Sequence, residues 1–352
     1  MAATLPAMPS PQSDPGAACG ADAAAHEGCS RGMWAVIEEQ LEDELDYYHA
    51  TLEHMELRVE MEAKVLLRRS GRGGGAEGVP AVGGLQRSLC WHFLHEMTRR
   101  SQCPLQCFFQ AMHALDDSLA VVPLEQPPEN SHILPRAAAV WCIIAKSEGF
   151  QHITTSLQMV ALCVSEFSKR LGTGVPPILA GDIEREELRL LRAGLPDLHE
   201  PTMLQWIDLV RERFNVVSRG RAGNVFPATA PWMHSVAALA MHSMPSSEEL
   251  PPRAIVVALS GLALVAAGLL RADTLLPAYV TDARWRDALE QVLQGPEERL
   301  RDQDPPELEP RAAIAALEFA TGVPIEEVRS FVPAVVLLVL GACTAQRQPQ
   351  EA

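Results

Sequence analysis

The chain has 352 residues and a formal net charge of −16, from 45 acidic and 29 basic residues. This charge balance argues against a protein that binds the phosphates of nucleic acid, because such binding needs a basic surface. Hydrophobic residues form 47% of the chain and aromatic residues only 5%, so its cores are built from Ala, Leu and Val. Such cores favour helix over strand. We therefore predict an all-α protein of about two domains.

The eight cysteines are scattered, and most of them lie in apolar stretches with helical spacing. This distribution favours reduced, buried cysteine in a nuclear or cytoplasmic protein over a set of disulfides. Cys103 and Cys107 have a spacing that is found in metal sites, but no second pair follows them. We therefore expect neither a zinc site nor a cofactor. The first residues lack a basic segment followed by an apolar one, so no secretory signal is expected.

Three segments precede the first domain. Residues 1–30 are rich in Ala, Pro, Ser and Gly without periodicity, which predicts disorder. Residues 33–69 repeat apolar residues at helical spacing and run from an acidic start to a basic end, which predicts an amphipathic helix. Residues 70–84 are rich in Gly but lack the Lys-Ser/Thr of a phosphate-binding loop, so we predict a flexible linker.

The first domain, residues 85–195, is predicted to hold five helices around a central one. The expected helices are 86–99, 104–119, 135–150, 154–171 and 181–193. The third is apolar all round, and such a helix must be enclosed by others. A proline at its start and Lys146 near its end suit the two ends of a helix. Asp182 is expected to cap the last helix, and Gly194 to end it.

The second half repeats this plan loosely. The expected elements are 201–215, 232–244, 254–270, a charged stretch at 282–310 with an inserted loop, 311–321 and 332–345. Pro-Arg precedes the uncharged helix in both halves, which indicates a second, divergent bundle at 196–345. The 17 residues 254–270 carry no charge and approach the ~20 that span a bilayer. Their small residues also suit a buried helix, which we favour over a membrane span.

The first five helices, taken together, resemble the cyclin box. Five segments are similar, in order, to the motifs of that family: 86–96 (QRSLCWHFLHE), 111–119 (AMHALDDSL), 143–148 (IIAKSE), 187–192 (ELRLLR) and 201–202 (PT). The resemblance extends from residue 33 to 340 and is thinner beyond Thr202. It implies two tandem five-helix cyclin-like folds, preceded by an N-terminal helix and a disordered N-terminus.

Two charges in the first domain lie among apolar neighbours on their helices. Arg87 and Asp116 each need a partner there, and an Arg–carboxylate fork between the first two helices satisfies both. The alternative is two unrelated surface charges. In cyclins the matching pair is a structural bridge, so the resemblance assigns both residues to the fold.

A second pair is predicted between Lys146 and Glu187. On a helical wheel Glu187 falls on the apolar face of Ile183, Leu190 and Leu191, where a pairing with Lys146 would satisfy both charges. Taken alone, Lys146 is explained as a solvated charge at a helix end. The register is uncertain by one residue, so Glu186 is the alternative partner. In cyclins the matching pair lies at the kinase interface, so the resemblance implies that these residues bind a kinase.

A third set of residues corresponds to the patch with which cyclins dock substrate motifs: Gln86, Leu89, Phe93 and Glu96. Gln86 and Cys90 depart from the residues usual in that patch. The resemblance therefore implies a weakened or altered docking of substrates.

The resemblance implies a protein without chemistry of its own. It would bind a cyclin-dependent kinase and hold the kinase αC helix inward, as a regulator of cell division in the nucleus and cytoplasm. The eleven histidines form no cluster, and no Ser or Cys lies in a nucleophile motif, so an enzyme is not expected. The alternatives are a cyclin-fold adaptor of the transcription-factor type, against which the acidic charge counts, and a membrane-associated helical protein.

Overall fold

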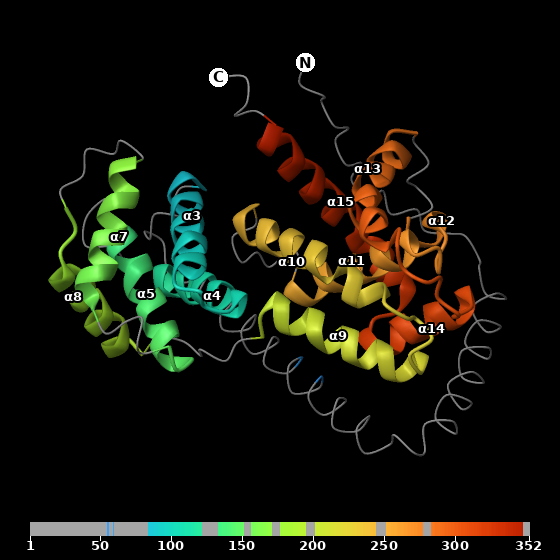
Figure 1. Cartoon of the computed structure of the whole chain (residues 1–352), viewed down its shortest axis with the longest axis horizontal. Coiled ribbons are helices and arrows are strands. Elements are labelled where there is room, and N and C mark those ends of the chain that lie inside the picture. The colour runs from blue at the N-terminus through green and yellow to red at the C-terminus, as the bar shows by residue number, and fades with distance from the viewer. Residues whose placement is uncertain are drawn as a thin grey trace, which may run out of the picture. The chain divides into compact units, whose positions relative to one another are not determined.

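The computed structural model describes residues 55, 59, 84–121, 133–150, 156–170, 177–194, 201–243, 251–276 and 283–347 (Figure 1). The regular elements in these ranges are helices and none is a strand, which confirms the all-α prediction. The predictions for residues 1–30 and 70–83, and most of the predicted helix 33–69, lie outside the described residues. Gly84, predicted as the end of the linker, is the first residue of a helix instead.

The first set of helices surrounds α5 (Ile133–Ser147). The others are α3 (Gly84–Arg100), α4 (Leu105–Val121), α7 (Leu157–Arg170) and α8 (Ala180–Arg192), and each of them contacts α5. Every residue of α5 from Arg136 to Ala145 is buried. The helix predicted to be central is therefore enclosed, as its uncharged sequence requires.

A glycine ends α5 directly after its lysine. Gly149 has a φ of +82°, which is a left-handed conformation that suits glycine. The N–H of Phe150 donates to the carbonyl of Ala145 at 2.8 Å, and the N–H of Gly149 donates to that of Lys146 at 3.3 Å. This is the Schellman pattern of a helix C-terminus. It fixes Lys146 in the last turn of α5, where the helix dipole favours a cation.

The second set surrounds α11 (Pro252–Ala266), which is buried from Ala254 to Leu264. Its neighbours are α9 (Met203–Ser218), α10 (Val225–Ser243), α12 (Ala272–Leu275), α13 (Ala283–Leu300), α14 (Pro310–Thr321) and α15 (Ile325–Arg347). The uncharged stretch 254–270 thus forms a helix as far as Ala266, and other helices of the chain cover it. Among the described helices, none combines the length and the apolar character needed to cross a bilayer.

The helix that opens the second set begins at a capping box. Thr202 Oγ1 accepts a hydrogen bond from the backbone N–H of Gln205 at 3.3 Å, and Gln205 Oε1 accepts one from the N–H of Thr202 at 3.0 Å. This arrangement satisfies two of the N–H groups that a helix start leaves without partners. Thr202 also donates to Gln106 Oε1 of α4 at 2.9 Å, so the same residue links the two sets of helices.

Two helices of the second set begin earlier than predicted, because they continue through a proline. α10 begins at Val225 rather than 232 and contains Pro231, and α15 begins at Ile325 rather than 332 and contains Pro333. Each proline removes one backbone hydrogen bond. The neighbours Trp232 and Val332 are buried, and that burial offsets the loss.

The predicted N-terminal helix is represented by Met55 and Val59, which are both helical. Met55 Cε lies 2.9 Å from the position that a Cβ would occupy on Gly322, the residue that caps α14 with a φ of +66°. The backbone conformation favours glycine there, whereas the Met55 methyl group is the end of a flexible side chain that could shift.

Candidate partner-binding site

Lys146 and Glu187 form an ion pair between the end of α5 and the middle of α8. Lys146 Nζ donates to Glu187 Oε1 at 2.7 Å and to Oε2 at 2.9 Å. The lysine side chain is 41% exposed, whereas that of the glutamate is 10% exposed and shares its face of α8 with the buried Ile183 and Leu190. An ammonium has three donors, so the lysine keeps one N–H for a further acceptor.

The alternative partner, Glu186, has a different role from the one predicted. Its Oε2 accepts a hydrogen bond from Arg136 Nε at 3.0 Å, and its Oε1 lies 3.4 Å from an Arg189 nitrogen. Arg136 lies at the start of α5 and is completely buried. Sequence reasoning missed Arg136 because Pro-Arg was interpreted only as the start of a helix. A charged residue in the first turn of an otherwise apolar, buried helix needs a partner, and this signal could have identified Arg136.

Large apolar side chains lie exposed on α8, which carries Glu187, and on the neighbouring α7. On α8, Leu188 is 47% exposed and Leu191 is 57% exposed. The prediction that Leu191 shares the buried face of Glu187 is therefore wrong. Leu179, before this helix, and Met159 and Leu162 on α7 are also exposed. Large apolar side chains that flank a half-buried charge pair are typical of a surface that a protein partner covers.

Buried cysteines near the site are not nucleophiles. Burial, aided by the Glu187 carboxylate, raises the pKa of the Cys142 thiol to about 12. Burial likewise raises the pKa of Cys107 to about 12. At neutral pH these thiols are protonated, and a thiol is a poor nucleophile and metal ligand compared with a thiolate.

Arg87 and Asp116 form the predicted fork. Arg87 Nε donates to Asp116 Oδ1 and its terminal nitrogen to Oδ2, each at 2.9 Å, and both side chains are only 7% exposed. Arg87 also donates to the carbonyl oxygens of Met241 and, at 3.1 Å, His242, in the last turn of α10. The guanidinium therefore joins three helices, α3, α4 and α10, rather than the two predicted. The negative end of the α10 dipole favours this placement.

The predicted docking patch is not an exposed surface. Gln86 is 7% exposed and Phe93 is 1% exposed, and the Phe93 ring packs against that of Phe167 with centroids 5.5 Å apart. Leu89 is half-buried. The Glu96 carboxylate is occupied by Arg170 of α7, at 2.6 and 2.7 Å. Two of the four predicted docking residues, Gln86 and Phe93, are therefore buried, and α7 covers Phe93 and Glu96. Docking of substrates at Gln86, Leu89, Phe93 and Glu96 stays a prediction.

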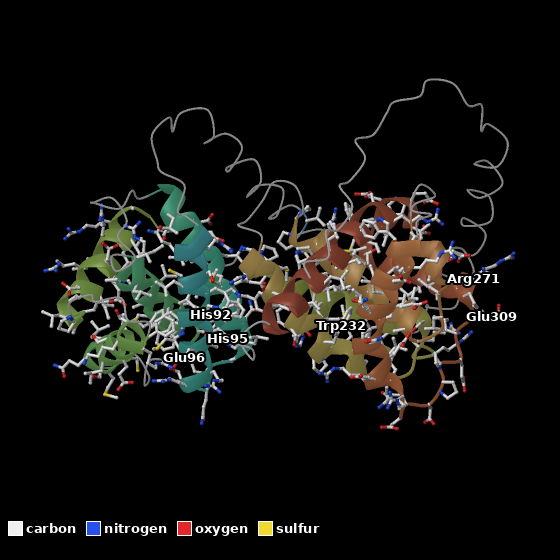
Figure 2. All side chains as sticks on the ribbon, turned by 90° about the horizontal axis from the view of Figure 1, so that it is seen from above. His92, His95, Glu96, Trp232, Arg271 and Glu309 are labelled. Carbon is white, nitrogen blue, oxygen red and sulfur yellow. The ribbon has the colours of Figure 1, made fainter. Side chains whose placement is uncertain are left out.

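The prediction that the histidines form no cluster is also wrong. The indole of Trp91 stacks on His95 with centroids 5.1 Å apart and meets His92 and His242 edge-on, at 4.9 and 5.3 Å. Figure 2 shows His92 and His95 near each other on α3. His242 comes from α10, so the cluster arises only when distant segments meet. In the described part of the chain, no group of three or more His, Cys, Asp or Glu residues is arranged to hold a metal ion.

Acid is expected to weaken the contact between α3 and α10. His242 Nε2 lies 2.8 Å from Ser88 Oγ, close to His92, Arg87 and the Asp116 that pairs with Arg87. Burial, then the charges of His92 and Arg87, lower the pKa of His242 below 6.5. The unfolded chain therefore binds protons more readily, and stability falls as the pH drops through 6.5. Thermal unfolding from pH 8 to pH 5 measures this fall. His242→Gln should flatten the profile, and an unchanged profile would exclude His242 as its source.

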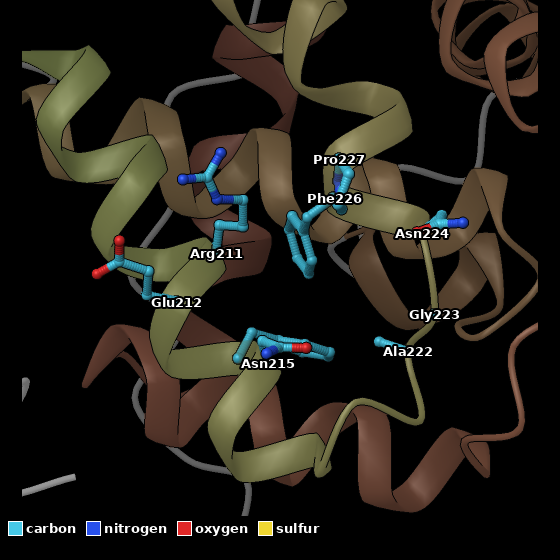
Figure 3. A pocket seen from close by; sticks show the side chains of 9 residues that line it. Arg211, Glu212, Asn215, Ala222, Gly223, Asn224, Phe226 and Pro227 are labelled. Carbon is cyan, nitrogen blue, oxygen red and sulfur yellow. The ribbon is translucent and has the colours of Figure 1, made fainter. Parts of the chain in front are cut away.

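A shallow hollow of about 270 Å³ lies between α9 and the start of α10 (Figure 3). Phe214 and Phe226 are buried at its floor, with ring centroids 4.9 Å apart. Its polar lining residues Asn215 and Asn224 are exposed to water. A ligand site usually presents polar groups that converge in a buried setting, so we assign no ligand to this hollow.

Comparison with known proteins found no match for this chain among family models, curated proteins or solved structures.

Proposed function

We propose that the chain is a cyclin-like regulatory subunit that binds a protein kinase through Lys146, Glu187 and the exposed leucines of α8. The observation that carries the proposal is the ion pair itself: its lysine is 41% exposed at 2.7 Å from a glutamate that is nearly buried. The five sequence motifs that resemble the cyclin box, in their order, support the same assignment. The finer fold, two tandem cyclin-like bundles, is part of this proposal.

The surface suits a partner that presents a helix. Burial of Leu188 and Leu191 would supply apolar contact area, at roughly 25 cal/mol per Å² before the costs of association. The remaining N–H of Lys146 would donate to a backbone carbonyl of the partner. Glu187 holds the ammonium in place, so little side-chain entropy remains to be lost on binding.

The chemistry in this proposal belongs to the kinase. A kinase is active when its αC helix lies inward, so that a Lys–Glu ion pair and the magnesium site are complete. A subunit that binds the inward state more tightly than the outward one shifts the population toward activity. Because α7 covers Phe93 and pairs with Glu96, the proposal leaves the selection of substrates to the kinase.

Reversal of the charge at Lys146 tests the proposal. In Lys146→Glu a carboxylate faces Glu187, and kinase binding is expected to weaken by roughly 30-fold or more, since loss of one partner of a charge pair that an interface buries costs about 2–5 kcal/mol. The tagged chain is used to capture partners from cell extract, and the bound kinase is identified and assayed. Lys169→Glu, at an exposed lysine in the last turn of α7, is the matched control. Equal kinase recovery with both variants would refute the assignment.

A further inference from the structure

Helix α8 has two faces with the same apolar content. The buried face consists of Ile183, Glu187 and Leu190. The neighbouring exposed face consists of Glu184, Leu188 and Leu191. Each holds two large apolar residues and one glutamate, and successive residues are about 100° apart round a helix. A turn of α8 by one residue would therefore bring the second face into the place of the first with little change in buried apolar area, so burial alone does not select the observed rotation.

The charges on α5 distinguish the two rotations. Arg136 and Lys146 lie near opposite ends of α5, and they pair with the adjacent residues Glu186 and Glu187 at 3.0 and 2.7 Å. In the observed rotation each cation has a carboxylate. After a turn by one residue, Glu187 would take the place of Glu186 beside Arg136, and Leu188 would lie against Lys146.

The two cations differ in what they require. Arg136 is completely buried, whereas the Lys146 side chain is 41% exposed and can be solvated. A buried charge without a carboxylate is costly, and a charge at the surface is not. If Glu186 were neutral, Arg136 would therefore compete with Lys146 for the Glu187 carboxylate.

We propose that Glu186 is a positioning residue: by neutralising the buried Arg136, it leaves Glu187 to Lys146 and holds α8 in the rotation that exposes Leu188 and Leu191. The pair selects one geometry among similar ones, which is the best-attested role of a buried ion pair. The claim that exposed Leu188 and Leu191 contact a partner rests on the proposed function. The claim that Glu186 fixes the rotation of α8 does not.

Zero-length cross-linking of Lys146 to Glu187 measures the geometry without a partner. A carbodiimide joins an amine and a carboxylate in contact, with loss of one water, and mass spectrometry quantifies the linked peptides. We expect Glu186→Gln to lower the yield at least threefold while helical circular dichroism is retained. Glu184→Gln, at an exposed glutamate on the same helix, should leave the yield unchanged. A parental yield in Glu186→Gln would overturn the proposal.

A second variant removes the competitor. In Arg136→Met/Glu186→Gln no buried cation draws Glu187 away, so the yield should return to that of the parent. If Glu186→Gln fails to fold, a double variant that folds and gives the parental cross-linking yield supports the proposal. Failure of both variants to fold overturns it.

Kinase capture separates this inference about α8 from the proposed kinase-binding function. Loss of the cross-link in Glu186→Gln, with no kinase bound even by the parent, would leave the inference standing and refute the function.

Discussion

Arg87→Ala is expected to lower the free energy of unfolding by about 3–5 kcal/mol, the range measured when one partner of a buried ion pair is removed. The substitution strands Asp116, whose side chain is 7% exposed. It also removes the donor to the carbonyl oxygens of Met241 and His242 at the end of α10. Urea denaturation followed by circular dichroism measures the change.

Two variants separate the buried pair from a general effect of lost charge. Arg100→Ala, on the same helix, removes an arginine whose side chain is 40% exposed and pairs with Glu96, so a loss of less than about 1 kcal/mol is expected. Arg87→Met/Asp116→Leu removes both buried charges and should recover much of the stability lost in Arg87→Ala. If Arg87→Ala and Arg100→Ala were equally stable, the fork would not hold the helices together.

The features that sequence predicted best are those set by local periodicity. The central helix, predicted at 135–150, is apolar on all sides, so its own sequence predicts that it is buried. The structure buries it from Arg136 to Ala145. Glu187 was expected to need a partner because it falls among apolar positions of its own helix. Both inferences need only the 3.6-residue repeat of a helix, whereas the choice of Lys146 as the partner was what the resemblance to the cyclin box implied.

Features that depend on packing between distant segments were not predictable. The covering of Phe93 and Glu96 was not foreseen, because it comes from Phe167 and Arg170 of α7, some 70 residues away; the Arg170–Glu96 contact spans 74 residues. The histidine cluster brings His242 to Trp91, which also donates to the carbonyl of Ala238 across 147 residues. No local pattern encodes such contacts, and tertiary packing decides them.

In each of the two sets of helices, a buried arginine donates hydrogen bonds to carbonyl oxygens at the C-terminal end of another helix. Arg87 donates to the last turn of α10, and Arg213 of α9 donates to the carbonyl oxygens of Phe319 and Ala320, both at 3.0 Å, in the last turn of α14. A helix leaves its last carbonyls without intrahelical partners, and its dipole is negative there. In the amphipathic segment 201–215, Arg213 is not distinguishable by sequence from an exposed arginine.

Replacement of Arg213 by methionine is therefore expected to destabilise the protein by about 2–4 kcal/mol, since carbonyls at the end of α14 lose charged donors in a buried setting. Arg213 is 2% exposed, and its guanidinium lies 5.6 Å from the centre of the Phe319 ring, so packing is lost as well.

The matched control is Arg211→Met, two residues away on the same helix. Arg211 pairs with Asp208 at the surface at 3.1 Å, with side chains 37% and 46% exposed, so a change within about 0.5 kcal/mol is expected. Thermal and urea unfolding of the two variants measure the difference. A similar loss in both would show that the position of Arg213 is not special. A large loss in Arg213→Met alone would establish that α9 holds α14 through its C-terminal carbonyls, as α3 holds α10.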